Sequence, residues 1–341
     1  MTDLTRIGVD TSKSVFTLHG VDAAGCCVLR RNLRRREFEA FFQKLPPVEV
    51  VLEACGGSHH WGRWLMKLGH RVRLIPPQYI KPFVKRGKND RNDAEAICVA
   101  AAQPSIGDVP VKAVETQAGA MLLSTRELLV RQRTQLVNAL RGHATELGLV
   151  APQGDKGLTQ LQGEIATADD EVVPPAAKEA LALLGKQVDR VQARLAEIDA
   201  KLKKQLAADP LSQRLAHIPG VGPIIALNLA LRVNPAQFKS GRHFAAWLGL
   251  VPRERSTGGK QRLGVISRAG DERLRQLLVV GATAVIRHAT SGRAGASPWL
   301  LELLKRRPRK LVAVAWANKM ARIVWAMMTS GEAYRPAKAA A

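Results

Sequence analysis

Segments rich in β-branched and apolar residues alternate with helix-forming segments over the first 75 residues of the chain. Such an alternation is typical of an α/β domain, in which helices cover the faces of one sheet. We place the end of this domain near residue 105. We predict three strands within 6–31, further strands at 48–53 and 70–75, and helices at 35–45 and 61–68.

The chain beyond residue 105 has the periodicity of long helices. Residues 115–149 predict one helix, and residues 176–207 predict a second with an a/d seam. Heptads alone do not fix the partner of a seam, so both an antiparallel hairpin with the 115–149 helix and a dimer interface remain open. The seam consists of Leu181, Leu184, Val188, Val191, Leu195, Ile198 and Leu202. We assign 106–207 to a linker and coiled-coil region.

Residues 208–341 predict a third, mainly helical domain. A Gly/Ser-rich break interrupts it at 291–297, and a basic segment, KRRPRK, follows at 305–310. The fold class predicted for the whole chain is therefore α/β followed by mainly α.

The chain carries a strong positive charge. Its 52 Lys and Arg residues stand against 29 Asp and Glu, which gives a formal net charge of +23. Such a charge favours a polyanionic partner, either nucleic acid or an anionic membrane surface. No signal peptide is recognisable, and the apolar stretch Leu311–Met328 is interrupted by Lys319 and Arg322, so we expect no membrane span. We predict a cytoplasmic protein that binds nucleic acid.

Cysteine and aromatic residues exclude several kinds of site. The four cysteines have no spacing typical of a disulfide framework or a zinc site, so we predict free thiols. Aromatic residues make up 4% of the chain, which argues against a base-stacking platform.

Acidic residues stand at the ends of predicted strands and at a predicted helix start. Asp10 ends the first strand, Glu53 ends the strand at 48–53, and Asp90 and Asp93 begin a helix after a proline-rich break. If the two strands are neighbours, as in a ribonuclease H-like sheet, these carboxylates converge and favour Mg²⁺, which prefers oxygen ligands. Alternatively, Asp10 is a turn residue, and Asp90 and Asp93 are acids favoured by the helix dipole.

The segment HIPGVGP at 217–223 is typical of a helix-hairpin-helix turn. Gly220 and Gly222 would let backbone amides approach a DNA phosphate at the start of the next helix. The alternative is a plain Gly/Pro turn between two core helices.

The segment PRERSTGGKQRLG at 252–264 combines hydroxyls, glycines and cations. Ser256 on a flexible loop could attack a phosphodiester while the cations offset the developing charge. Alternatively, Ser256 only contacts phosphate. GGK lacks the other residues of a P-loop, and no histidine adjoins Ser256 in sequence, so a general base would come from elsewhere in space. The flanking cations are Arg253, Arg255, Lys260 and Arg262.

Six segments together resemble one family, and they follow its order along nearly the whole chain. They are GVDTSK, LEACG, KNDRNDAEA, HIPGVGP, AAWLGLVPRERSTGGKQRLG and ISRAGDERLRQLLV. They resemble the bridge-RNA-guided insertion-sequence transposases of the "one-ten" family, and STGGK is similar to its "eleven-eleven" branch.

The resemblance implies a RuvC-like domain with a DEDD carboxylate set, a coiled-coil region and a helical transposase domain with a serine nucleophile. By position in the motifs, the nucleophile falls on Ser256, with Thr257 as the alternative in register. The carboxylate set falls on Asp10, Glu53, Asp90 and Asp93. The resemblance also implies a structured guide RNA, a homodimer that assembles into a tetramer on donor and target DNA, and a composite site to which two subunits contribute.

We interpret the protein as a bacterial, nucleoid-associated recombinase that exchanges DNA strands through a 5′-phosphoserine, with Mg²⁺ positioning the phosphate. Arg253, Arg255 and Lys260 are candidate stabilisers of the transition state. One alternative is a metal-dependent nuclease or junction resolvase without a covalent intermediate. Another is a nucleic-acid chaperone that acts through charge alone.

Overall fold

The computed structural model describes residues 4–85, 89–291 and 297–335. It divides into two compact units, Met1–Gln117 and Ala118–Ala341, and each is described by itself. Most of the predicted break at 291–297 lies outside the described residues. The proposed boundaries at 105 and 207 stay predictions.

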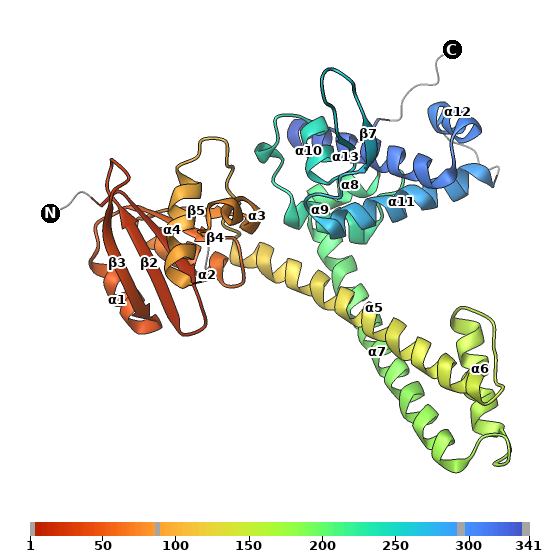
Figure 1. Ribbon diagram of the computed structural model, residues 1–341. Helices are drawn as coiled ribbons and strands as arrows, with labels where there is room; N and C mark the ends of the chain where they lie inside the picture. The colour runs from red at the N-terminus through yellow and green to blue at the C-terminus, as the bar shows by residue number, and fades with distance from the viewer. Residues whose placement is uncertain (1–3, 86–88, 292–296, 336–341) are drawn as a thin grey trace. The chain divides into compact units, whose positions relative to one another are not determined.

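The N-terminal unit contains a five-stranded sheet in the order β3-β2-β1-β4-β5 (Figure 1). β1, β2 and β3 form the predicted antiparallel meander, whereas β4 and β5 run parallel to β1. The predicted α/β organisation is thereby confirmed. The strands are β1 (Arg6–Thr11), β2 (Val15–Val21), β3 (Cys27–Arg34), β4 (Glu49–Glu53) and β5 (Arg71–Ile75).

Helices cover both faces of this sheet. On one face, Val9 and Leu52 pack with Phe38 of α1 and Leu65 of α2 in one core. On the other face, Val51 packs with residues of α4. The helices are α1 (Arg35–Lys44), α2 (Ser58–Lys67), α3 (Pro77–Ile80), the 3₁₀ turn η1 (Lys81–Phe83) and α4 (Asp90–Ala101).

α4 lies unusually close to the sheet because a glycine faces it. A Cβ on Gly8 of β1 would lie 2.5 Å from the Ala94 carbonyl oxygen of α4. The Gly8 amide also donates to the Cys98 Sγ at 3.0 Å. This close packing holds the first turn of α4 above the ends of β1 and β4.

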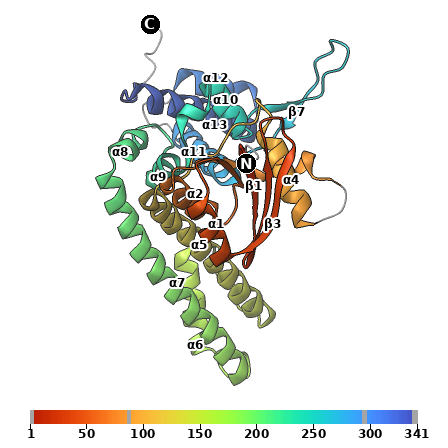
Figure 2. The ribbon, with the colours of Figure 1, turned by 90° about the vertical axis from the view of Figure 1, so that its left-hand side faces the viewer.

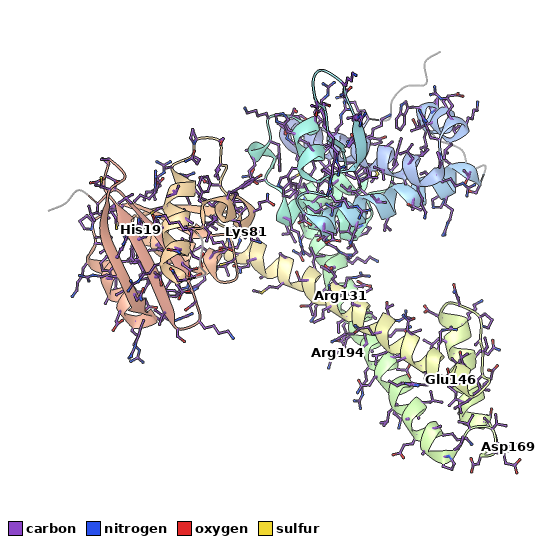
Figure 3. The ribbon with its side chains drawn as sticks, in the orientation of Figure 1. His19, Lys81, Arg131, Glu146, Asp169 and Arg194 are labelled. Atoms are coloured by element: carbon purple, nitrogen blue, oxygen red, sulfur yellow. The ribbon has the colours of Figure 1, made fainter. Side chains whose placement is uncertain are left out.

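Two long helices of the second unit form an antiparallel hairpin (Figure 3). The predicted seam packs within the chain, since Leu181 and Val188 of α7 join Leu140 of α5 in one core. Further along, Arg126 of α5 pairs with Asp199 of α7. The structure thus supports the hairpin interpretation for the buried seam residues. The helices are α5 (Val114–Glu146), α6 (Asp155–Thr167) and α7 (Pro175–Ala208).

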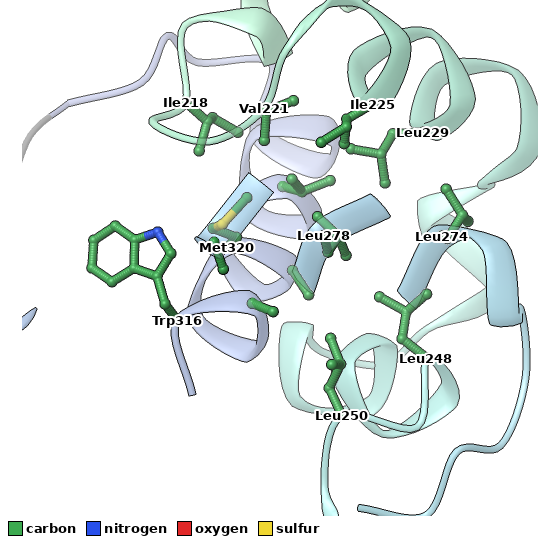
Figure 4. Close-up of a cluster of buried hydrophobic side chains, with 14 of the residues drawn as sticks. Ile218, Val221, Ile225, Leu229, Leu248, Leu250, Leu274, Leu278, Trp316 and Met320 are labelled. Carbon is green, nitrogen blue, oxygen red and sulfur yellow. The ribbon is translucent and has the colours of Figure 1, made fainter. Parts of the chain in front are cut away.

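The rest of this unit is a helical core built around α13 (Figure 4). Leu274 and Leu278 of α11 belong to the same buried cluster as Met320 and Val324 of α13. Among the described residues, α13 is the one helix that is long and apolar enough to cross a membrane. One side of it lies in this core, as in soluble helical domains. The helices are α8 (Pro210–Ala216), α9 (Pro223–Arg232), η2 (Pro235–Gln237), α10 (Gly241–Trp247), α11 (Glu272–Thr290), α12 (Pro298–Arg306) and α13 (Arg309–Ser330).

A two-stranded hairpin projects from the helical core (Figures 1 and 2). It consists of β6 (Pro252–Glu254) and β7 (Leu263–Ile266), which are antiparallel. The sequence predicts a flexible loop here, and the structure differs because the segments on either side of STGGK pair with each other. We call residues 252–266 the serine hairpin.

Candidate functional site

Asp10 and Glu53 lie on the same face of the sheet. β1 and β4 are parallel and paired through Val9 and Leu52, so the residues that follow, Asp10 and Glu53, lie side by side. Gly8 and Val51, two positions earlier, both contact α4. Because side chains alternate along a strand, Asp10 and Glu53 point to the α4 face as well.

The remaining two acids stand in the first turn of α4. Asn89 is the N-cap, and its side chain accepts a hydrogen bond from the Asn92 amide at 2.8 Å. Carboxylate oxygens of Asp10, Asp90 and Asp93 lie within 4.8 Å of one another. Glu53 does not belong to this close set. We call Asp10, Glu53, Asp90 and Asp93 together the acid cluster.

The acids affect one another electrostatically. Burial, followed by the charges of Asp93, Asp90 and Glu53, raises the pKa of Asp10 to about 6. A hydrogen bond from the Thr11 backbone opposes this shift. Burial and then Asp93 also raise the pKa of Glu53, while Lys81 lowers it. These directions indicate that Asp10 and Glu53 are held as anions only at a cost in free energy.

The acid cluster fits a divalent metal ion. Its donors are carboxylate oxygens, which hard cations such as Mg²⁺ prefer, and a cation would relieve the repulsion that raises the pKa of Asp10. Asp10, Asp90 and Asp93 are close enough to share one ion, and Glu53 could support it from β4. Bound there, a divalent ion can polarise and orient a phosphate group.

The serine hairpin carries Ser256 next to a tight turn. The Lys260 amide donates to the Thr257 carbonyl at 3.1 Å, and Gly258 and Gly259 have φ of 57° and 75°. Two consecutive positive φ angles are typical of a type I′ hairpin turn, which glycine adopts most easily. The two glycines therefore shape this turn, which reverses the chain so that β6 and β7 can pair.

The hydroxyl of Ser256 has a carboxylate partner in the same hairpin. Ser256 Oγ donates to Glu254 Oε1 at 2.8 Å, and the Arg262 amide donates to Ser256 Oγ at 3.4 Å. The sequence predicts a general base from elsewhere in space, but the structure places Glu254 of the same hairpin beside Ser256. Residues two apart in a strand share a face, so a hairpin assignment would have identified Glu254 as a neighbour of Ser256.

Four cations surround Ser256 on this hairpin. The Arg253 guanidinium donates to the Ser267 carbonyl at 3.1 Å, so it is engaged at the base of the hairpin. The Arg255 amide donates to the Arg262 carbonyl at 2.9 Å. All four side chains, Arg253, Arg255, Lys260 and Arg262, belong to exposed residues. An anionic strand could therefore reach them from solvent.

The two glycines of HIPGVGP have different surroundings. A Cβ on Gly220 would lie 2.9 Å from the Gly281 carbonyl oxygen, and Gly220 has φ of 90°. Gly220 is therefore required for packing of the turn against α11. Gly222 is exposed, precedes α9 as its N-cap, and has open space where a Cβ would stand. The Gly222 side of the turn is therefore open to an approaching phosphate.

Two transposase family models match the chain. One, for DEDD transposases of the IS110 group, covers residues 7–148, and the other, described as the IS116/IS110/IS902 transposase family, covers residues 212–296. The acid cluster lies in the first matched segment, and the serine hairpin lies in the second.

Similar proteins extend over nearly the full length of the chain. A transposase of Sinorhizobium fredii is 53% identical over 337 residues, which cover 98% of this chain and 87% of the relative. The transposase of insertion sequence IS1111A from Coxiella burnetii is 39% identical, with 98% and 92% of the two chains covered. That of IS1328 from Yersinia enterocolitica is 37% identical, with 98% and 99% covered.

Proposed function

The chain belongs to the IS116/IS110/IS902 family of transposases, close to those of IS1111 and IS1328, and on this basis we propose that it is an RNA-guided recombinase that forms a 5′-phosphoserine. Family membership makes it an enzyme that processes DNA during transposition. The finer proposal concerns the chemistry of strand exchange, its guide and its metal. The observation that carries it is the hydrogen bond between Ser256 and Glu254.

Ser256 would be the nucleophile and Glu254 its proton acceptor. Attack of Ser256 Oγ on the scissile phosphorus forms the O–P bond, and the Ser256 proton passes to the Glu254 carboxylate 2.8 Å away. The bond from phosphorus to the 3′ oxygen breaks, and the protonated Glu254 carboxyl then returns its proton to that oxygen, which leaves as a free 3′ hydroxyl. The covalent link conserves the phosphodiester energy, so the reverse attack by a 3′ hydroxyl reseals the strand without ATP.

The acid cluster would hold Mg²⁺, which would polarise and position the scissile phosphate. Asp10, Glu53, Asp90 and Asp93 would be its ligands, while Arg255, Lys260 and Arg262 of the serine hairpin would offset the negative charge that develops on the phosphoryl oxygens. Arg253 would mainly stabilise the hairpin, because its guanidinium already binds the Ser267 carbonyl.

The proposed partners are donor and target DNA, a structured guide RNA and further copies of the chain, in the bacterial cytoplasm. The net charge of +23 supports binding to nucleic acid. The open N-terminal end of α9 at Gly222 supports a backbone contact by the turn at 217–223, whereas Gly220 would act through packing. A dimer that assembles into a tetramer would have to use surfaces other than the buried seam between α5 and α7.

A metal-dependent nuclease is the second candidate. It is favoured by the acid cluster, because close carboxylates with a divalent ion are sufficient to activate water against a phosphodiester. In that case Ser256 would only contact phosphate, and the products would be free 5′-phosphate ends.

Covalent capture distinguishes the two candidates. The full chain is incubated with Mg²⁺ and element-end DNA labelled on the 5′-phosphate side of the cleaved bond, and the products are separated on denaturing gels. We expect a protease-sensitive adduct that Ser256→Ala abolishes and that Thr257→Ala retains. The reverse result would assign the nucleophile to Thr257. Cleavage without an adduct in the wild type would favour the nuclease.

Glu254→Gln tests the proton acceptor in the same assay. The amide keeps the size of the side chain but is a far weaker base, so adduct formation should slow by about 100-fold, a typical loss for general-base removal. Glu272→Gln, an exposed acid on α11, is the matched control and should leave the rate unchanged. An unchanged rate in Glu254→Gln would exclude it as the acceptor.

Guide RNA is tested by sequencing the nucleic acid that remains bound after a high-salt wash. Salt removes contacts that rest on charge alone. We expect one defined RNA species, and a random mixture would contradict the guided mechanism.

A further inference from the structure

A small cavity lies on the α4 face of the sheet in the N-terminal unit. Its volume is about 210 Å³. It is lined by residues of β2, β3 and the first turn of α4, and His19 of β2 (labelled in Figure 3) contributes to its wall. The lining side chains on this face are Thr17, His19, Arg30, Asn32 and Arg91.

The strand register aligns this cavity with the acid cluster. Asp10 of β1 is paired with Thr17 of β2, and Thr17 is paired with Asn32 of β3. Residues directly opposite each other in antiparallel strands point to the same face, so all three side chains lie in one row. Neighbouring strands are about 4.8 Å apart, which places Asn32 about 10 Å from Asp10 along the sheet.

The lining of the cavity is suited to an anion. Arg30 and Arg91 supply guanidinium groups, Thr17 a hydroxyl and Asn32 an amide, and none of the described residues that line the cavity is acidic. Within the described part of the chain, the side chains of Arg30, Asn32 and Arg91 show no hydrogen bond or ion pair. Glu95, whose charge interacts with those of His19 and Arg30, is already paired with Lys85 at 2.6 Å. The donors are therefore available to a ligand.

The remaining groups of the wall do not compete for that ligand. Burial lowers the pKa of His19, so its ring is neutral at physiological pH. Arg31 borders the cavity as well, but its guanidinium lies 5.7 Å from the centre of the Phe41 ring of α1, which packs on the opposite face of the sheet.

We propose that this cavity binds a backbone phosphate of the DNA strand whose scissile phosphate lies at the acid cluster. Successive phosphates of one strand are separated by more than their axial rise of about 3.4 Å, so a distance of about 10 Å spans at most about three nucleotides. Arg30 and Arg91 would bind the phosphate oxygens, and Thr17 and Asn32 would donate to them. The contact fixes which phosphate reaches the acids, and this inference rests on the proposed function of the acid cluster.

Phosphate-by-phosphate neutralisation tests the contact. Element-end DNA duplexes that each carry one uncharged methylphosphonate are bound to the full chain in Ca²⁺, and the cleaved bond is mapped separately in Mg²⁺. For the wild type, we expect one position within about three nucleotides of the cleaved bond at which neutralisation weakens binding about tenfold, as for loss of one charge-assisted contact.

The variant Arg30→Gln/Arg91→Gln should lose the sensitivity at that position, because the contact is already absent. Its log-log salt slope should also decrease by about 1 to 2. Arg31→Gln is the matched control, since it removes the same charge from the neighbouring residue on the opposite face, and it should keep the wild-type profile. Asn32→Asp, which adds one repulsive charge, should have the same effect. It serves as the test if the double variant folds poorly.

An unchanged profile in both Arg30→Gln/Arg91→Gln and Asn32→Asp would overturn the proposal, as would sensitivity that appears only with methylphosphonates in RNA. Failure of the proposed function has a different signature. If Asp10→Asn cleaves DNA normally while the cavity variants still lose the single-position sensitivity, the acid cluster is not the reaction site and the phosphate contact stands.

Discussion

Asp10 and Ser256 stand on backbones of very different kinds. Asp10 is the penultimate residue of a central strand that is covered by α4, and Gly8, two positions before it, lies against the backbone of that helix. Ser256 stands near the tip of a two-stranded hairpin whose own apolar side chains are uncovered, with Leu263 60% and Val265 72% exposed. The acids are thus positioned by packing, and the serine is positioned by a turn and local hydrogen bonds.

The acid cluster and the serine hairpin meet different physical requirements, rigid geometry in the first and mobility in the second. Holding carboxylates close together requires a stiff support, because their repulsion would otherwise push them apart. A nucleophile that must reach a DNA strand and then stay attached to it benefits from a support that can move without unfolding the core. We therefore expect substitutions in the acid cluster to change stability together with activity, and substitutions in the serine hairpin to change activity alone.

The largest expected effect is that of Asp10→Asn. Loss of this proposed metal ligand should reduce DNA cleavage about 1,000-fold. In metal-free protein at pH 7.5, the same variant should have a higher melting temperature than the wild type, because it removes a charge repelled by Asp90, Asp93 and Glu53. Ser256→Ala should lose a similar share of the activity with an unchanged melting temperature.

Glu39→Gln is a control for this pair, since Glu39 lies on α1 at the opposite face of the sheet, and it should change neither quantity. A melting temperature that falls in Asp10→Asn would contradict the view that the acids are held together against repulsion.

Two glycine substitutions should give a smaller, structural contrast. In Gly8→Ala the new Cβ would meet the Ala94 carbonyl oxygen at 2.5 Å, and this backbone atom can move only with α4. We expect a loss of about 2 to 3 kcal/mol in the stability of the N-terminal unit. In Gly258→Ala the Cβ meets open space, and the φ of 57° strains the turn by about 1 kcal/mol.

Hydrogen exchange resolved by peptide measures both changes. Gly8→Ala should speed exchange in β1 and α4, whereas Gly258→Ala should affect only the serine hairpin. Faster exchange throughout the helical core in Gly258→Ala would mean that the hairpin is an integral part of that core, and the distinction between the two regions would fail.

The sequence predicted the arrangement of the acids better than that of the serine hairpin for a physical reason. Parallel strands end at the same edge of a sheet, so acids after two apolar strands can be brought together by pattern alone, as with Asp10 and Glu53. The strands of the serine hairpin are three and four residues long and exposed, so they have almost no periodicity. Glu254 was therefore not recognised as a neighbour of Ser256.

Tertiary contacts account for the other differences. The role of Gly220 depends on Gly281, which lies 61 residues further along the chain, and no local pattern contains that pairing. Heptads predicted α7 as a helix with a seam, but only the structure selects α5 and α6 as its partners. Local periodicity thus identified the elements, while the contacts between them required the fold.

The smallest expected effect is a pH dependence that belongs to the acid cluster alone. Asp10 has a pKa of about 6 in the folded chain against an ordinary value of 3.8, so between these values the folded state binds a proton that the unfolded state has released. The stability of metal-free protein should therefore decrease as the pH rises through this window. A divalent ion competes with the same proton, so its affinity should fall about tenfold per pH unit below 6 and level off above it.

Calorimetric titration of nucleic-acid-free protein with Mn²⁺ from pH 5 to 7.5 measures this dependence. Ser256→Ala should reproduce the wild-type curve, because the serine hairpin supplies no ligand. Asp10→Asn should bind more weakly and with a flatter curve, since the group with the pKa of about 6 is gone, although Glu53, whose pKa is also raised, retains part of the slope. An affinity independent of pH in the wild type would show that Asp10 is already ionised without the metal, and the repulsion inferred from its burial and its neighbours would then be too weak to matter.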